Sequence, residues 1–512
     1  MKELIEEFKH DLPLFREMTE KFYRKELSQK DYKLFSGGYG SYTQRGANKS
    51  MLRLRFCGGR VTVDQLDFVV KAVQKYQVDM VHFTTCQSIQ LHNLDVQAVC
   101  GIMEEAYEHD IVTRGCGGDF PRNVMVSPLS DVDPAAYFDV HPYAKACADY
   151  LLGFIKKVKL PRKMKVSFTS SAHNDTHPTF RDLGFVAKPD GTFDVYSAGG
   201  LGNNPALGVC VGNGVKPSKV LYYVKAMVQL FIAHGDYENR QRARTRYMLN
   251  KLGQEAYVAA YRAELAEIEA TEELDIAPVA AAVTVKNATP RAVSHPRITA
   301  QKQPGLYYVT YHPTGGTPTV DDFVNLYAAM KNIAGAELRL GPDETAYIIN
   351  LTADEAEKIA AVTENAASSL VATSVACVGS AICQIGLQDS QQLLKTILDA
   401  VKPYQFKDGV LPRLHISGCS SSCGTHQIGA IGFHGSAKVV GNTPQPAFHL
   451  FVNGSENKGE ERFGALLGIM TVAAIPEFLI ALGKTVAEAD ETFATWYPNH
   501  EAEFKALAEA YL

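Results

Sequence analysis

The chain has 512 residues, of which 46% are hydrophobic and 21% are charged, and its formal net charge at pH 7 is -5. This is the composition of a soluble globular protein with room for roughly three domains, and the weakly acidic charge argues against a nucleic-acid partner. No segment approaches the roughly 20 apolar residues of a membrane span, and residues 1–16 lack the apolar core and cleavage site of an export signal. We therefore expect a cytoplasmic protein without a membrane partner.

Hydrophobic periodicity predicts a helical arm over residues 1–36, which the Gly-Gly-Tyr-Gly run at 37–40 ends. Beyond the arm, alternating and helical patterns predict a small β-α-β-β-α unit with helices on one face of its sheet. Its elements are a strand at 51–56, a helix from Thr62 to about Gln74, strands at 80–85 and 88–91, and a helix at 96–108.

The same pattern returns about 257 residues later in the chain. Three pairs of segments match: Gly58–Asp64 with Gly315–Asp321, Leu160–Arg162 with Leu411–Arg413, and Asp182–Phe185 with Ala430–Phe433. A repeat of this length predicts a duplicated chain with pseudo-twofold symmetry.

Two cysteine pairs lie in the last third of the chain, Cys377 with Cys383 and Cys419 with Cys423. Four thiolates select soft metal centres and can complete the ligand shell of a [4Fe–4S] cluster. Zinc is the main competitor, although structural zinc sites favour gaps of two to four residues and the first pair is separated by five. Spacing alone leaves open an iron–sulfur cluster, a zinc site, and unligated or disulfide-bonded cysteines.

Among the glycine-rich runs of the sequence, only the one from Gly199 to Asn204 has a composition typical of a catalytic loop. It lacks the spacing of a dinucleotide fingerprint and does not clearly join a strand to a helix, so we predict no nicotinamide site. Electrons for a redox reaction would then come from a separate protein.

Several short motifs accompany the cysteines and the repeat. They are Met-Leu-Arg-Leu-Arg at 51–55 before a Gly-Gly turn, Pro-Arg-Asn-Val at 121–124, and Leu-Pro-Arg-Lys-Met-Lys at 160–165. With these motifs in this order, the chain resembles the siroheme-dependent sulfite and nitrite reductases over roughly residues 35–510.

The resemblance implies an α+β fold, a pseudo-twofold duplicated chain with two ferredoxin-like half-domains and two α/β lobes for siroheme and the Fe–S cluster. The implied segments are a helical arm at 1–36, half-domain 1 at 37–110, lobe 1 at 111–272, a linker at 273–304, half-domain 2 at 305–370 and lobe 2 at 371–512.

The resemblance also implies roles for individual residues. Those expected to hold the [4Fe–4S] cluster are Cys377, Cys383, Cys419 and Cys423, the last of which would bridge to the siroheme iron. Those expected to surround the substrate side of siroheme as catalytic residues are Arg53, Arg122, Lys163 and Lys165. Those expected to bind cofactor are Arg55, Gln87, Gly199, Gly200, Asn203 and Ser421. Four cations in one pocket repel one another unless anions offset them, so we expect an oxyanion site.

Two positions depart from the family. The family usually has an arginine in the segment that holds Cys86 here, and an asparagine in the turn that here reads Ser420–Ser422. These two differences leave open how the siroheme ring is bound, and they do not affect the four cysteines.

The implied activity is the six-electron reduction of sulfite to sulfide, with ferredoxin or another separate protein as donor. Lys165 favours sulfite, because nitrite enzymes of the family often have asparagine there. Nitrite reduction to ammonium is the alternative reaction, and an Fe–S electron carrier or a zinc-stabilised scaffold is the alternative without catalysis.

Overall fold

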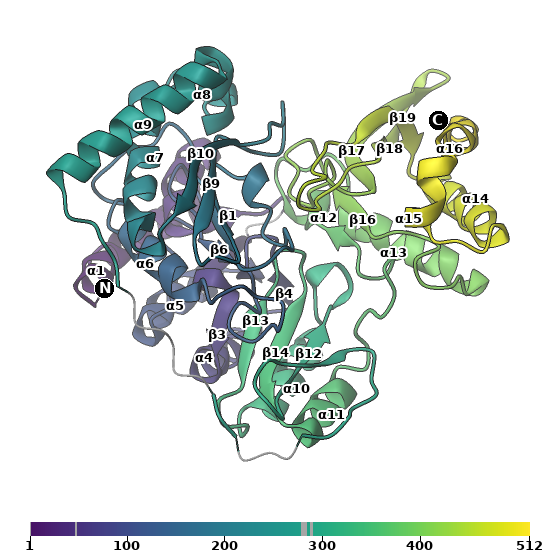
Figure 1. The fold of residues 1–512 in the computed structure, drawn as a ribbon, viewed down its shortest axis with the longest axis horizontal. Helices are drawn as coiled ribbons and strands as arrows, with labels where there is room; N and C mark the ends of the chain where they lie inside the picture. The colour runs from purple at the N-terminus through teal and green to yellow at the C-terminus, as the bar shows by residue number, and fades with distance from the viewer. Residues whose placement is uncertain (1, 47–48, 278–283, 287–289) are drawn as a thin grey trace. The chain divides into compact units, whose positions relative to one another are not determined.

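The computed structural model describes residues 2–46, 49–277, 284–286 and 290–512. Residue 1 of the expected arm and residues 278–283 and 287–289 of the expected linker lie outside this description. The chain divides into two compact units, each made of several segments. Figure 1 shows the course of the chain, coloured by residue number. Unit 1 comprises Met1–Gly200, Pro205–Tyr311 and Pro318–Glu364, and unit 2 comprises Leu201–Asn204, His312–Thr317 and Asn365–Leu512.

The expected helical arm of unit 1 is confirmed as three helices, α1 (Lys2–Lys9), α2 (Leu12–Tyr23) and α3 (Gln29–Ser36). The side chain of Ser28 caps α3 by accepting from the backbone N–H of Asp31 at 3.1 Å. On α2, the Arg16 guanidinium forms two hydrogen bonds with Glu104, at 2.9 and 2.7 Å. The arm is therefore bound to the first half-domain.

Half-domain 1 contains a four-stranded sheet in the order β1-β2-β5-β4. Its strands and helices are β1 (Ser41–Thr43), β2 (Ser50–Arg55), β4 (Met80–Phe83), β5 (Ser88–Leu94), α4 (Val63–Lys75) and α5 (Val96–Ala106). These elements confirm the β-α-β-β-α prediction. The start of α4 is fixed by a capping box in which the side chains of Thr62 and Gln65 each accept from the other residue's backbone N–H.

Half-domain 2 repeats this arrangement with a five-stranded sheet in the order β11-β12-β14-β13-β3. Its elements are β11 (Ile298–Ala300), β12 (Tyr307–Tyr311), β13 (Glu337–Leu340), β14 (Ala346–Leu351), α10 (Val320–Met330) and α11 (Ala353–Val362). The last strand, β3 (Arg60–Thr62), comes from the first half-domain and pairs with β13. Strand β11 falls within the expected linker, where Ile298 is buried opposite Val309 and gains a sheet partner.

The two lobes have the same sheet topology. In lobe 1 the order is β10-β9-β8-β7-β6, and in lobe 2 it is β15-β16-β17-β18-β19. The first three strands of each lobe in chain order are parallel to their neighbours, and the last two add in antiparallel fashion. This correspondence confirms the duplication.

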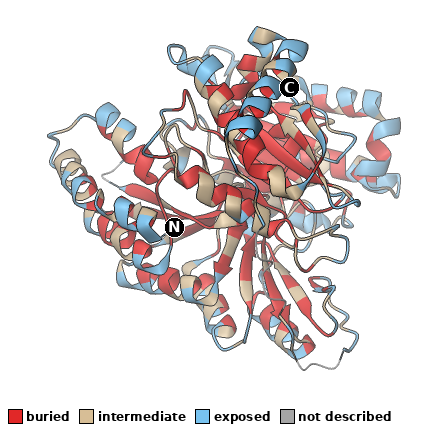
Figure 2. Cartoon of the chain, turned by 60° about the vertical axis from the view of Figure 1, so that its left-hand side comes forward, coloured by how far each residue is buried: buried red, intermediate tan, exposed pale blue. Residues whose placement is uncertain are grey.

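The elements of lobe 1 are β6 (Met125–Val126), β7 (Val166–Thr169), β8 (Leu183–Ala187), β9 (Phe193–Ser197), β10 (Val209–Val215), α6 (His141–Leu152), α7 (Val220–His234), α8 (Thr245–Leu252) and α9 (Gln254–Thr271). Those of lobe 2 are β15 (Val375–Ala376), β16 (Leu414–Ser417), β17 (Ile431–Val440), β18 (Thr443–Val452), β19 (Ala465–Thr471), α12 (Gly379–Ile382), α13 (Ser390–Val401), α14 (Ala474–Glu488), α15 (Phe493–Trp496) and α16 (Glu501–Glu509). Figure 2 shows the buried residues concentrated on the strands and on the helix faces that cover them.

Matched glycines show why the repeat survives in the sequence. Gly184 in β8 and Gly432 in β17 occupy equivalent places, and a Cβ atom on either would lie 2.2 Å from the Pro178 carbonyl oxygen or 1.8 Å from that of His426. Only glycine allows such an approach of the preceding loop to the strand. None of the helices in the described part of the chain combines the length and the apolarity that crossing a membrane requires.

Candidate active site

Unit 1 brings together basic residues from three separate segments. Arg53 lies in the middle of β2, and its Nη1 donates to the carbonyl oxygen of Cys116 at 2.5 Å. Arg122 donates to the same oxygen at 2.9 Å and to the carbonyl of Gly118 at 2.8 Å. Two predicted catalytic arginines therefore donate to the same carbonyl oxygen. Burial lowers the pKa of Arg122, and the nearby charge of Arg53 lowers it further.

The third segment carries the Lys-x-Lys motif. Met164 is fully buried and pairs with Pro121 in a short parallel bridge, and its carbonyl accepts from the backbone N–H of Arg122 at 2.9 Å. Lys163 and Lys165 flank Met164 and are both half-buried, so an extended backbone directs both away from the core that Met164 enters. The backbone N–H of Lys165 is fixed by the Asp182 carboxylate at 2.8 Å.

Cys86 lies in the turn between β4 and β5, among these cations. Lys165, Arg181 and Arg53 act on its thiol electrostatically. Burial raises the pKa of Cys86, but the three cations outweigh burial and lower it to about 6. The cluster formed by Arg53, Arg122, Lys165 and Arg181 around Cys86, which we call the cation cluster, thus favours a bound negative charge.

Arg181 is a member of the cation cluster that no sequence motif indicates. Its Nε donates to the carbonyl of Thr176 at 3.1 Å, and its Nη2 is 3.3 Å from Nδ1 of His177. The available signal was its position directly before the Asp182–Phe185 segment that recurs in the second half.

Two expected cofactor-binding residues of unit 1 have most of their polar groups engaged by backbone, although Nε of Arg55 is buried with no hydrogen-bond partner among the described residues. Arg55 is buried and donates to the carbonyls of Pro121 at 2.9 Å and Arg122 at 3.2 Å. Gln87 is fully buried, and its amide donates to the carbonyls of Val126 and Leu340, each at 2.7 Å, while its oxygen accepts from the N–H of Val126 at 2.8 Å. Both side chains hold loops together in this structure.

The glycine run lies between β9 and β10. A Cβ atom on Gly199 would lie 2.5 Å from the Thr179 carbonyl, and Gly200 exchanges two backbone hydrogen bonds with Ala206, each at 2.9 Å. Asn203 is exposed, and its neighbour Gly202 is held at both its N–H and its carbonyl by the side chain of Gln427, at 2.7 and 3.0 Å. The run is thus a glycine-rich loop rather than the strand-to-helix turn of a dinucleotide site.

In unit 2, both cysteine pairs lie at the carboxyl ends of adjacent parallel strands. Cys377 directly follows β15, and its backbone N–H donates to the carbonyl of Ile416 in β16 at 3.2 Å. The loop after Cys383 returns to the same edge, since Leu387 and Gln388 donate to the carbonyl of Gly418 at 2.8 and 3.0 Å. Cys419 follows Gly418 in the chain, so the two pairs meet.

Glycines make this meeting possible. A Cβ atom on Gly418 would lie 2.6 Å from the carbonyl of Gln388, and one on Gly424 would lie 2.0 Å from that of Ile416. The turn between the last two cysteines uses a left-handed residue, Ser422 at φ 55°, whose hydroxyl is buried without a hydrogen-bond partner among the described residues. Ser421, the expected cofactor contact, is exposed on the same turn.

The environment of the thiols suits a soft, multi-atom centre. Cys377, Cys383 and Cys419 are half-buried and Cys423 is exposed. The Sγ of Cys377 accepts from the N–H of Gly418 at 3.2 Å and lies 3.2 Å from the hydroxyl of Ser390, at the positive end of α13. Burial, together with Cys423, raises the pKa of Cys377 to about 12, and a bound metal would replace the proton of this thiol.

The arrangement does not match a site for one ion. Within the described ranges, no three His, Cys, Asp or Glu side chains are close enough to hold a single metal ion. A tetrahedral zinc site, with Zn–S bonds of about 2.3 Å, requires sulfurs within about 4 Å of one another. A [4Fe–4S] cube receives its thiolates at separate corners, and four cysteines that meet at one sheet edge fit it better.

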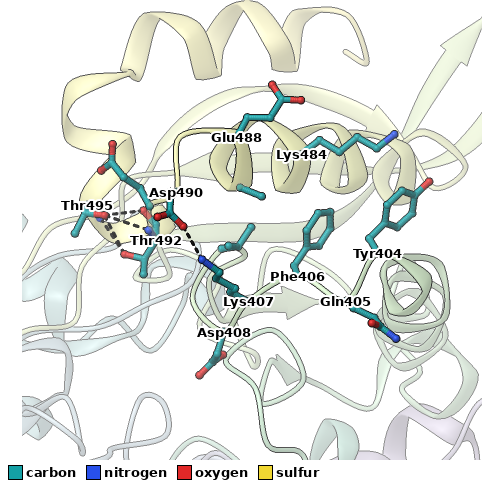
Figure 3. Close-up of a pocket in the computed structure, with 13 residues that line it drawn as sticks. Tyr404, Gln405, Phe406, Lys407, Asp408, Lys484, Glu488, Asp490, Thr492 and Thr495 are labelled. Carbon is teal, nitrogen blue, oxygen red and sulfur yellow. Dashed lines mark hydrogen bonds and ion pairs between the residues drawn. The ribbon is translucent and has the colours of Figure 1, made fainter.

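A hollow of 820 Å³ elsewhere in unit 2 is not part of this site. Figure 3 shows it between the segment from Tyr404 to Asp408 and the end of α14, with an ion pair of 2.6 Å between Lys407 and Asp490. It adjoins the C-terminal end of α13, whereas Cys377 adjoins the N-terminal end. At a rise of 1.5 Å per residue, the two ends of this helix are about 18 Å apart. Its lining carries no cysteine.

Two family models match the chain. One, described as the nitrite/sulfite reductase ferredoxin-like half domain, matches residues 42–109, and the other, described as the nitrite and sulphite reductase 4Fe-4S domain, matches residues 117–268. The second match covers lobe 1, which contributes three members of the cation cluster, whereas the cysteine quartet lies in the duplicated copy.

Relatives of similar length carry related names. The ferredoxin–nitrite reductase of Synechococcus elongatus is 26% identical over 419 residues, which cover 76% of this chain and 76% of the relative. The sulfite reductase [NADPH] hemoprotein beta-component of Bacillus subtilis is 24% identical over 443 residues, which cover 76% of this chain and 74% of the relative.

A solved structure shares the fold. The NirA protein of Mycobacterium tuberculosis superposes with a TM-score of 0.76 at 21% identity, covering 91% of this chain and 89% of that one. Both family models and these relatives agree, so the chain carries nitrite and sulfite reductase domains, which imply siroheme and a [4Fe–4S] cluster as cofactors.

Proposed function

We propose that this protein reduces sulfite to sulfide and that the cation cluster of unit 1 binds the substrate anion. The observation that carries the proposal is the convergence of Arg53, Arg122 and Lys165, with Arg181, around one site. Siroheme and the [4Fe–4S] cluster, when bound, supply the reducing centre and the stored electrons. The protein's own residues bind the anion and provide protons.

The charge of the cluster supports sulfite as substrate. Reduction of sulfite to hydrogen sulfide takes six electrons and eight protons and releases three water molecules. Sulfite carries up to two negative charges near neutral pH, and nitrite carries one, so a site with four cations stabilises sulfite more. The arginines offer a fixed fork of donors, and Lys165 can donate a proton and recover it from solvent.

The four cysteines of unit 2 have a role separate from that of the cation cluster. We assign the cluster to Cys377, Cys383, Cys419 and Cys423, because they meet at the edge formed by β15 and β16. By family resemblance, Cys423 would also bridge to siroheme, and its exposure is compatible with that role. Ferredoxin, which the names of several relatives specify as donor, is the proposed source of electrons.

Nitrite reduction to ammonium is the second candidate. It is favoured by the names of relatives such as the ferredoxin–nitrite reductases of Synechococcus elongatus and maize. It also consumes six electrons and can use the same cations.

Steady-state turnover of both anions with reduced methyl viologen separates the candidates. We expect a higher kcat/KM for sulfite than for nitrite in the natural sequence, and at least a tenfold fall in the sulfite-to-nitrite ratio in Lys165→Asn. Lys157→Asn, at an exposed lysine outside the cluster, should leave the ratio unchanged. A natural enzyme that prefers nitrite would overturn the assignment to sulfite.

A further inference from the structure

Two segments of unit 1 meet behind the cation cluster. The Gly-Gly-Tyr-Gly run at residues 37–40, which we call the arm end, joins the N-terminal arm to β1. Residues 113–118, which we call the carbonyl loop, supply the oxygens to which two arginines of the cation cluster donate. The N–H of Gly115 donates to the carbonyl of Gly38 at 2.9 Å, so the carbonyl loop is bonded to the arm end.

The arm end is also bonded to the strand that carries Arg53. The carbonyl of Gly40 accepts from the backbone N–H of Arg53 at 3.1 Å. The side chain of Arg53 in turn donates to the carbonyl of Cys116 in the carbonyl loop at 2.5 Å, and Arg122 donates to the same oxygen at 2.9 Å. Arg53 is therefore held by the arm end at its backbone and by the carbonyl loop at its side chain.

Glycines allow the arm end and the carbonyl loop to touch at the backbone. A Cβ atom on Gly117 would lie 2.3 Å from the carbonyl oxygen of Gly37, and one on Gly40 would lie 2.5 Å from that of Thr113. Gly40 also has a left-handed backbone, at φ 86°. Because the two backbones pack directly on each other, a shift of one segment moves the other.

Arg114 attaches the carbonyl loop to the arm a second time, through its side chain. Its guanidinium carbon lies 4.1 Å from the centre of the Tyr39 ring and 5.7 Å from that of Phe8 in α1. Its Nη2 is 3.6 Å from the carboxylate of Asp11, which precedes α2. Arg114 is buried and its Nε has no hydrogen-bond partner among the described residues, so the aromatic faces and the carboxylate offset much of the cost of burying its charge.

We propose that the N-terminal arm is part of the anion site: by holding the carbonyl loop, it sets the distance between the guanidinium groups of Arg53 and Arg122. This rests on the proposed function, because it takes these two arginines as substrate ligands. Two guanidinium groups repel each other, and the Cys116 carbonyl offsets that repulsion only while both donate to it. An anion bound by both arginines requires the same spacing. Arg114 acts through the carbonyl loop, so it is a positioning residue.

Hydrogen exchange of the purified holoenzyme, read by mass spectrometry, measures the hold on the carbonyl loop without turnover. In Arg114→Met we expect peptides that cover residues 113–118 to exchange about tenfold faster than in the natural sequence, because the loop loses its side-chain attachment. Arg16→Met is the matched control, since it removes two hydrogen bonds between the arm and Glu104 that do not involve the loop. It should leave these peptides unchanged. Unchanged exchange in Arg114→Met would overturn the proposal.

Steady-state kinetics with reduced methyl viologen measures the effect on anion binding. In Arg114→Met we expect KM to rise about tenfold for sulfite and for nitrite alike, with kcat changed less than about threefold, because both anions use the two arginines. In Arg16→Met both KM values should stay within about twofold of the natural enzyme. An equal rise in the two variants would show that the arm acts only through stability, and would contradict the positioning role.

A second pair of variants tests the arm end independently of Arg114. Gly40→Ala places a methyl group against the Thr113 carbonyl. Gly191→Ala is its control, because Gly191 has a similar φ of 82° but an added Cβ there would meet no described atom within 4 Å. We expect KM to rise in Gly40→Ala and to stay unchanged in Gly191→Ala. Equal KM values would count against the arm end, and if Gly40→Ala does not fold, the Arg114 variant decides.

Failure of the proposed function would look different from failure of this inference. A natural enzyme that reduces nitrite and not sulfite would overturn the assignment to sulfite, and its KM for nitrite would still test the arm. Faster exchange of the carbonyl loop in Arg114→Met, together with an unchanged KM for both anions, would overturn the role of the arm and leave the reductase activity standing.

Discussion

The backbone N–H of Gly418 donates to the Sγ of Cys377 at 3.2 Å, so the loop that carries the second cysteine pair is bonded to a thiol of the first. A backbone donor aimed at sulfur stabilises a thiolate and tunes the centre it ligates. We therefore treat the four cysteines as one ligand set.

Replacement of one of the four cysteines should prevent the [4Fe–4S] cluster from binding. We expect Cys419→Ser to lose most of its acid-labile sulfide and non-haem iron while unit 1 stays folded, because that unit contains none of the four thiols. Chemical iron and sulfide analysis measures the loss. The matched control is Cys210→Ser, which removes an exposed thiol in lobe 1 and should retain both. Equal retention in Cys419→Ser would exclude Cys419 as a ligand.

Gln87 provides a test between cofactor binding and a structural role. Gln87→Leu leaves three buried backbone groups, at Val126 and Leu340, without partners. At about 1–3 kcal/mol for an unsatisfied buried group, we expect the free energy of unfolding to fall by roughly 3 kcal/mol or more. Urea unfolding measures this loss, with exposed Gln392→Leu as the control.

Siroheme content decides the same question independently. The folded Gln87→Leu protein should keep a normal ratio of siroheme to polypeptide, because its amide is occupied by backbone. A variant of unchanged stability that loses siroheme would instead support the cofactor-binding role expected from the family.

A buried ion pair should make unit 1 sensitive to acid. Arg339 is fully buried and forms hydrogen bonds with both oxygens of Asp131, at 3.1 and 3.0 Å. Burial alone would raise the pKa of Asp131, but the Arg339 charge lowers it to about 2. Since this is below the unfolded value of about 3.9, the stabilisation is complete above pH 4 and is lost as pH falls toward 2.

Unfolding of Asp131→Asn at several pH values checks this window. We expect the variant to be less stable than the natural sequence by about 2 kcal/mol or more at pH 7, with the difference closing between pH 4 and pH 2. Asp354→Asn, at an exposed ion pair with Arg291, should cost less than about 1 kcal/mol. A difference that stays constant down to pH 2 would show that the Asp131 charge is not what stabilises the fold.

Local patterns were sufficient for most of the fold. The matched Gly-Gly turns, at φ 60° for Gly58 and 56° for Gly315, and the threonine caps that follow them are local signals that appear directly in the sequence. Strand β11 was missed because three residues carry no periodicity. The pairing of β3 with β13 was missed because it joins residues such as Thr62 and Glu337, far apart in the chain.

The sequence indicates individual residues of the site but not which of them lie together. The cysteine spacing and the motifs that contain Arg53, Arg122 and Lys165 pointed to residues that the structure brings into two groups, one in each unit. Arg181 lies directly before the repeated Asp182–Phe185 segment, but that position does not indicate which residues it acts on. The displaced ionisation of Cys86 depends on cations from distant segments, which only the tertiary structure brings near it.

The electron balance of turnover tests the central claim most directly. Holoenzyme supplied anaerobically with a limiting amount of sulfite and excess reduced methyl viologen should oxidise six viologens per sulfite and release one sulfide. Oxidation of two viologens per sulfite, or none with a fully loaded enzyme, would contradict the account.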